Sequence, residues 1–133
     1  MRAILLAMKD ARVNKEDVGY INFHGTSTVL NDKIETLSVK RAFNSRAMNI
    51  PASSTKSMVG HPQGASGALG VAVTALSLME GILTPTINME KPDPECDMDY
   101  VSNEGRDKDI RIAISNCISF GSKNSTIVLK KFG

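Results

Sequence analysis

Residues 18–28 read VGYINFHGTST, an apolar run that ends in a histidine followed by glycine and hydroxyl residues. The apolar part predicts a strand, and the residues after His24 predict a loop. A second stretch, residues 50–61, repeats the arrangement, because its apolar-to-hydroxyl run leads to Lys56 and His61. Ligand-binding residues gather at strand ends in α/β proteins. We therefore expect both histidines to belong to one active site.

Three helices are predicted around these strands. Residues 3–12 have an amphipathic pattern, and Asp32 with Glu35 has the spacing of an N-cap and its capping glutamate, so a second helix is expected from 32 to about 43. Residues 64–79 are apolar or small on nearly every side, which predicts a helix buried all round. Its glycines each cost about 1 kcal/mol relative to alanine, which makes sense only if another backbone passes close by.

The remainder of the chain is expected to add strands. Residues 83–89, 110–114 and 126–130 are strand candidates, with a proline-rich loop at 91–95 and a tight turn at 119–122. This order of elements predicts a layered α/β fold with a mixed sheet.

Length and composition restrict the function classes. A chain of 133 residues with 41% hydrophobic and 23% charged residues is expected to form one soluble globular domain over 1–133. The net charge of +2, without a long basic run, argues against a nucleic-acid partner. The apolar residues at 1–8 are interrupted by Arg2, Lys9 and Asp10, well below the roughly 18 residues of a membrane span, and no signal-peptide cleavage pattern follows, so a cytoplasmic location is expected. Cys96 and Cys117 lack CxxC spacing, which argues against a zinc site or a redox pair.

The histidines and their charged neighbours suggest a specific chemistry. Two neutral imidazoles can donate hydrogen bonds to an oxygen that becomes negative during a reaction. A buried pair of Lys56 and Glu35 could orient His24 and His61 and tune their protonation. The alternatives are ordinary structural histidines, a helix-capping Glu35 and a surface Lys56.

Other polar residues allow two interpretations each. Thr26 and Thr28 could bind an extended polar ligand, although hydroxyl residues also stabilise turns. Cys117 could be a nucleophile, but a small buried cysteine with no adjacent base is the simpler interpretation.

Several motifs together resemble the C-terminal half of β-ketoacyl-acyl-carrier-protein synthases of the type II elongating kind, from about Arg2 to Lys131. The motifs are residues 24–28, 31–33, 53–61, 64–68, 85–88 and 96–101. The resemblance implies a thiolase-like fold, in which two similar α/β halves pack with buried helices between their sheets. This chain would supply only the second half.

The resemblance also implies an acyltransferase activity. Members condense a malonyl thioester with an acyl group held on a catalytic cysteine, releasing carbon dioxide and forming a 3-oxoacyl thioester in fatty acid or polyketide synthesis, without a metal or organic cofactor. By this resemblance, His24 and His61 would promote decarboxylation and stabilise the enolate, while Lys56 and Glu35 would balance the charge of the site. Thr26 and Thr28 would bind the phosphopantetheine arm, and Phe120 would gate the acyl pocket.

The same resemblance implies partners. The family's nucleophilic cysteine belongs to the N-terminal half, so this half is expected to be inactive when isolated and to need that partner. An acyl carrier protein bearing acyl and malonyl groups, and a homodimer of the complete enzyme, are also implied. The alternative function is a non-catalytic module for acyl-carrier binding or dimerisation.

Several positions depart from the family pattern. The gating turn, usually Phe-Gly-Phe-Gly-Gly, is ISFGS at residues 118–122, which loses the conformational freedom of two glycines. Val29 replaces a usual proline. Gly70 stands where many members place a glutamate associated with a bound cation, so no metal is expected. Cys117 coincides with a second reactive cysteine of related thiolases.

Overall fold

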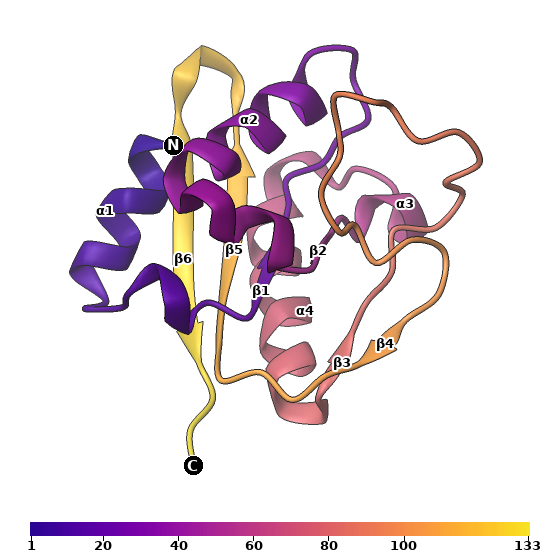
Figure 1. The fold of residues 1–133 in the computed structure, drawn as a ribbon. Helices are drawn as coiled ribbons and strands as arrows, with labels where there is room; N and C mark the ends of the chain where they lie inside the picture. The colour runs from indigo at the N-terminus through magenta and orange to yellow at the C-terminus, as the bar shows by residue number, and fades with distance from the viewer.

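A four-stranded sheet with helices on both faces forms the centre of the computed structural model, which describes all 133 residues, Met1–Gly133 (Figure 1). The strand order is β2-β1-β5-β6, with β2, β1 and β5 parallel and β6 antiparallel to β5. The sheet is therefore mixed, as predicted. Its strands are β1 (Tyr20–Asn22), β2 (Ala52–Ser53), β5 (Ile112–Ile118) and β6 (Asn124–Lys130).

Helices connect and cover these strands. The α-helices are α1 (Arg2–Asp10), α2 (Asn31–Phe43), α3 (Lys56–Val59) and α4 (Ser66–Glu80). Short 3₁₀ turns are η1 (Lys15–Asp17), η2 (Asn44–Asn49), η3 (Gln63–Ala65) and η4 (Phe120–Ser122). A separate two-stranded sheet pairs β3 (Ile82–Leu83) with β4 (Arg106–Asp107). None of the helices is long and apolar enough to span a bilayer.

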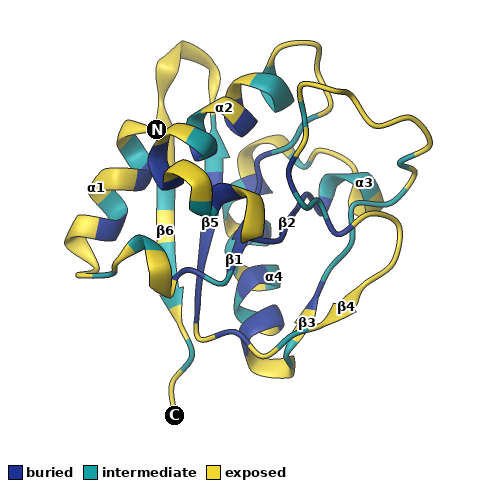
Figure 2. Ribbon diagram, viewed as in Figure 1, coloured by how far each residue is buried: buried dark blue, intermediate teal, exposed yellow.

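Alternating side chains of β1 and β5 build two apolar cores, one on each face of the sheet. Ile21 and Ile114 pack with α1 and α2, whereas Tyr20 and Ala113 pack with Leu78 of α4. This follows from strand geometry, in which successive side chains point to opposite faces. Figure 2 shows β1 and β5 buried, while the β5–β6 turn and much of the segment between β3 and β4 are exposed.

The glycine-rich helix α4 approaches the sheet closely on one side. A Cβ added to Gly70 would lie 2.9 Å from Ser115 Oγ and 3.3 Å from Asn22 Oδ1, so a side chain at this position would force the neighbours apart. The predicted close approach is thus present. Burial all round is not found within this chain, because the opposite face exposes Leu76 and Met79 to solvent.

Two strand predictions need correction. The strand expected at 83–89 ends at Leu83, since Pro85 has no N–H to donate to a ladder, and only Thr86 forms an isolated bridge, to Ser102. The strand expected at 110–114 is instead Ile112–Ile118. It is buried on both faces over residues 112–116, because helices cover both sides of the sheet.

Candidate active site

The two histidines meet at the carboxyl ends of neighbouring parallel strands. His24 follows β1, and His61 follows β2 by way of α3 and Gly60, whose φ of +75° turns the chain back. The ring centroids lie 5.5 Å apart with an interplanar angle of 82°. The sequence prediction that one site contains both rings agrees with this geometry.

Glu35 holds the backbone that carries His24. Its carboxylate accepts hydrogen bonds from the backbone N–H groups of His24 and Gly25, both at 2.9 Å. It also accepts from the side-chain amides of Asn116 at 3.2 Å and Asn31 at 3.4 Å. Burial raises the pKa of the Glu35 carboxyl, and the hydrogen bonds that it accepts oppose this rise. All four groups donate, which matches an ionised carboxylate that only accepts.

The helix-capping interpretation of Glu35 is wrong. Helix α2 begins at Asn31, and the residue at its N-cap position, Leu30, makes no side-chain capping hydrogen bond. Spacing alone does not distinguish a glutamate that turns back toward its own helix end from one that points into the neighbouring loop. Here the loop after His24 passes over Glu35, and its N–H groups take the place of the helix terminus.

Lys56 binds the carbonyl side of the backbone segment whose N–H side is bound by Glu35. Its Nζ donates to the His24 carbonyl oxygen at 2.5 Å, and Ser54 Oγ donates to the Gly25 carbonyl at 2.8 Å. Burial lowers the pKa of Lys56, against the attraction of Glu35. Lys56 and Glu35 form no direct ion pair. They contact the carbonyl and N–H sides of the same backbone segment instead of contacting each other.

The environment of His24 keeps its ring neutral at physiological pH. The residue is 6% exposed, and its Nδ1 is buried without a hydrogen-bond partner. Burial, followed by the positive charge of Lys56 and the proximity of His61, lowers the pKa of His24 to about 4. A neutral imidazole carries one N–H donor and one acceptor nitrogen, so His24 is suited to donate to an oxygen rather than to carry charge.

Local hydrogen bonds define the neutral tautomer of His61. The backbone N–H of Gln63 donates to His61 Nδ1 at 3.1 Å, and Ser66 Oγ lies 2.9 Å from the same nitrogen. Because a backbone N–H can only donate, Nδ1 of the neutral ring must be the acceptor. The ring proton then resides on Nε2, which makes His61 a second donor beside His24.

Most of the predicted site residues line one cavity of about 790 Å³. These residues are His24, Thr26, Thr28, Glu35, His61 and Phe120, together with Cys117. Lys56 lines a second cavity of about 780 Å³, which Thr26 and Thr28 also line. The hydroxyls of Thr26 and Thr28 lie 3.4 Å apart, and Thr28 also accepts from the Asn31 N–H at 3.3 Å. Thr28 therefore stabilises the turn before α2 in this structure.

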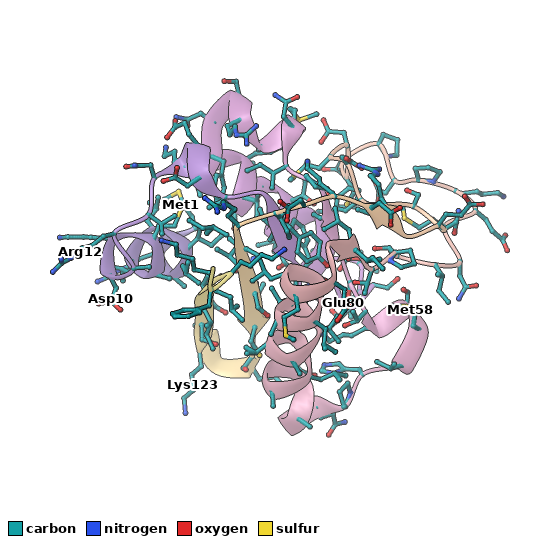
Figure 3. The ribbon with its side chains drawn as sticks, turned by 90° about the horizontal axis from the view of Figure 1, so that it is seen from below. Met1, Asp10, Arg12, Met58, Glu80 and Lys123 are labelled. Atoms are coloured by element: carbon teal, nitrogen blue, oxygen red, sulfur yellow. The ribbon has the colours of Figure 1, made fainter.

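The altered turn at 118–122 connects β5 to β6 and exposes Phe120 fully, at 103%. Figure 3 shows Lys123, the residue before β6, pointing away from the rest of the chain. Gly121 has a φ of +71°, and Ser122 is held at a φ of +63°, a region that favours glycine. Ser119 is extended, at φ −122°. Only the second of the two glycine replacements therefore strains the backbone.

We expect Ser122→Gly to raise the free energy of unfolding by about 0.5 kcal/mol. Relief of a left-handed conformation, about 1–2 kcal/mol, outweighs the greater unfolded-state entropy of glycine, about 0.4–1 kcal/mol. The matched control is Ser119→Gly, which gains no relief and is expected to lose about 0.5 kcal/mol. Urea unfolding measures both, and equal effects at the two positions would contradict this account.

Three residues that position the histidines were missed from the sequence. Asn116 donates to Glu35 and accepts from Thr126 Oγ1 at 2.8 Å, Ser66 contacts His61, and Ser54 holds the Gly25 carbonyl. Asn116 lies on the face of β5 that points toward the site. The alternation of side chains along β5 could have identified it as a site residue, but only if the sheet register had been known. Ser54 and Ser66 lie in runs of small residues that give no separate signal.

Comparison with known proteins gives a consistent result. Residues 1–90 match the family model described as "Beta-ketoacyl synthase, C-terminal domain". The chain is 47% identical over 131 residues to a 3-oxoacyl-[acyl-carrier-protein] synthase 2 of Synechocystis sp., covering 98% of this chain and 32% of that relative. The chain thus spans about a third of the length of the curated relatives it matches.

Solved structures share the fold. A type II polyketide ketosynthase, in complex with its acyl-carrier protein and bound to the hexaketide, superposes with a TM-score of 0.97 at 36% identity. The ishigamide ketosynthase/chain length factor gives 0.95 at 36% identity. Each likeness covers 99% of this chain and 32% of the other. They confirm the predicted α/β, thiolase-like class.

Proposed function

The chain belongs to the C-terminal domain family of β-ketoacyl synthases, and from this premise we propose that it supplies the histidine half of a 3-oxoacyl-acyl-carrier-protein synthase. The proposed reaction is a decarboxylative condensation of malonyl and acyl thioesters in fatty acid or polyketide synthesis. The observation that carries it is the pair of facing rings, His24 and His61, 5.5 Å apart on one cavity.

The geometry suits the charge that this reaction develops. Decarboxylation breaks the bond between the malonyl carboxylate and the α-carbon, and its electron pair moves into an enolate whose negative charge rests on the thioester oxygen. The imidazole N–H groups of two neutral rings that line one cavity can donate to that oxygen and stabilise its negative charge. The enolate carbon then attacks the acyl carbon, and the bond to the nucleophilic sulfur breaks.

The other predicted site residues position the histidines or control access to the cavity. Glu35 and Lys56 fix the backbone of His24, so in this proposal they are positioning residues. Thr26 and Thr28, on the cavity wall, would bind the phosphopantetheine arm, and the exposed Phe120 would gate the acyl pocket.

The proposal includes three partners. An N-terminal half would carry the nucleophilic cysteine, an acyl carrier protein would deliver the thioesters, and two complete enzymes would form a homodimer. The similar ketosynthase found with its acyl-carrier protein supports the second of these. Without the N-terminal half, the chain is expected to catalyse no condensation.

The test uses the enzyme assembled from this chain and a half that carries the cysteine. We expect His24→Ala and His61→Ala each to lower the release of carbon dioxide from a malonyl thioester about 10²–10³-fold, because each removes a donor to the enolate oxygen. The exposed Lys130→Ala is the control and should leave the rate unchanged. Normal carrier binding with no loss of rate in either histidine variant would instead support the non-catalytic module.

A further inference from the structure

Tyr100 contacts the two elements that hold the candidate active site, although it does not line the cavity of the histidines. Its ring packs edge-on against Phe23, the residue before His24, with the ring centroids 5.8 Å apart at an interplanar angle of 87°. Its hydroxyl forms a hydrogen bond with the hydroxyl of Thr36, the residue after Glu35. One side chain therefore bridges the strand that leads to a histidine and the helix that carries the carboxylate partner of that histidine's backbone.

The direction of the hydroxyl hydrogen bond follows from the other contact of Thr36. Thr36 Oγ1 lies 2.7 Å from the carbonyl oxygen of Asp32, which can only accept, so the single hydroxyl hydrogen of Thr36 is donated there. The Tyr100 hydroxyl must then donate to Thr36 Oγ1. Burial raises the pKa of Tyr100, so this hydrogen stays in place at physiological pH. Removing it would leave a buried acceptor on α2 without a donor.

The backbone on both sides of Tyr100 is fixed. The Asp99 carbonyl accepts from the Ala52 N–H of β2 at 2.7 Å, and the Asp99 carboxylate accepts two hydrogen bonds from Arg106, at 2.5 and 2.9 Å. Val101 is buried in the core on the α4 face of the sheet, at a φ of +46° that a β-branched residue adopts only where its surroundings impose it. The position of the Tyr100 ring is therefore set independently of α2.

Two ion pairs join the same helix to the same loop, but they are exposed. Lys33 pairs with Glu95 and Lys40 with Asp97, each at 2.5 Å, on side chains that solvent reaches. Exposed ion pairs contribute little and are screened by salt. The hydroxyl pair lies between them along α2 and is the buried contact that can fix the helix.

The rotation of α2 about its own axis decides where Glu35 points. Successive helical residues are turned by about 100°, so a contact at Thr36 fixes the direction of the side chain before it. Glu35 needs this accuracy because it accepts from two consecutive N–H groups, those of His24 and Gly25. Rotation of the helix would weaken both hydrogen bonds together.

We propose that Tyr100 is a positioning residue for the histidine pair, which sets the rotation of α2 against β1 and thereby keeps Glu35 on the backbone of His24. Its consequence for condensation rests on the proposed function. Its effect on the Glu35 hydrogen bonds is a property of this chain and is measured without turnover.

The experiment is amide hydrogen exchange of the ¹⁵N-labelled chain, followed by NMR, in Tyr100→Phe, which keeps the ring against Phe23 and removes only the hydroxyl. We expect the amides of His24 and Gly25 to exchange about fivefold faster relative to that of Ile114, the change that one lost hydrogen bond gives. Ile114 lies in a central strand, so its exchange reports the stability of the whole chain. The ratio therefore excludes a general loss of stability.

The control variants separate the proposed contact from the loss of any buried hydroxyl. Thr36→Val removes the acceptor and should raise the ratio as Tyr100→Phe does, whereas Thr36→Ser keeps a hydroxyl and should not. Tyr20→Phe is the matched control, because Tyr20 is the only other tyrosine and packs in the core on the opposite face of β1. Its buried hydroxyl contacts Ser53 at 2.6 Å, so its loss should leave the ratio unchanged.

The possible outcomes decide between the two claims. An unchanged ratio in a folded Tyr100→Phe variant, or an equal rise in Tyr20→Phe, would overturn the proposal. The expected ratio, combined with histidines that are dispensable for condensation in the assembled enzyme, would support the positioning by Tyr100 and overturn the proposed function alone.

Discussion

Glu35→Leu is expected to lower the free energy of unfolding by about 3 kcal/mol or more. The substitution removes the acceptor for the N–H groups of His24 and Gly25 and for the amide of Asn116. A buried donor left without a partner costs about 1–3 kcal/mol, and at least two of these donors lie in the interior. Urea unfolding followed by circular dichroism measures the change.

The control is Glu80→Leu, an exposed glutamate at the end of α4, which should change stability by no more than about 0.5 kcal/mol. Glu35→Gln should fall between the two, since it keeps one acceptor oxygen but turns an N–H group toward donors. A loss of only about 1 kcal/mol in Glu35→Leu, the typical effect of losing a helix cap, would contradict the network and restore the capping interpretation.

The outline of the site was predictable because topology decides it. Two parallel strands that neighbour each other must release their carboxyl ends at one edge, so His24 and His61 could be placed together from the runs that precede them. The glycines of α4 likewise indicated a close approach, which Gly70 makes against Ser115.

The hydrogen-bond partners could not be predicted in the same way. They depend on the path of the loop after β1, where Gly25 and Ser27 have φ values of +42° and +58° and turn the backbone N–H groups toward Glu35. Asn116 joins this network only through the strand register that places it opposite Thr126. Neither a left-handed φ nor a sheet register leaves a distinctive pattern in one sequence.

Gly25→Ala is expected to destabilise the chain by about 3 kcal/mol and to displace His24. Two effects combine. The φ of +42° disfavours a side chain by about 1–2 kcal/mol. The added methyl also overlaps Ser54 Cβ and lies 2.7 Å from Ser54 Oγ, and this crowding costs about 1–3 kcal/mol. Gly60→Ala separates them, because Gly60 has a φ of +75° with nothing within 4 Å of the added carbon.

Gly60→Ala should therefore lose only the conformational part, about 1 kcal/mol. The extra loss in Gly25→Ala has a direct route to the site, because Ser54 holds the Gly25 carbonyl and the adjacent His24 carbonyl is held by Lys56. Moving Ser54 shifts the backbone that sets the ring of His24 against His61. We expect unfolding experiments to give Gly25→Ala a much lower free energy of unfolding than Gly60→Ala. We expect ¹⁵N spectra to show changed signals of the His24 ring only in Gly25→Ala. Equal stabilities would mean that the loop relaxes around the methyl, and that the crowding at Ser54 does not fix the position of His24.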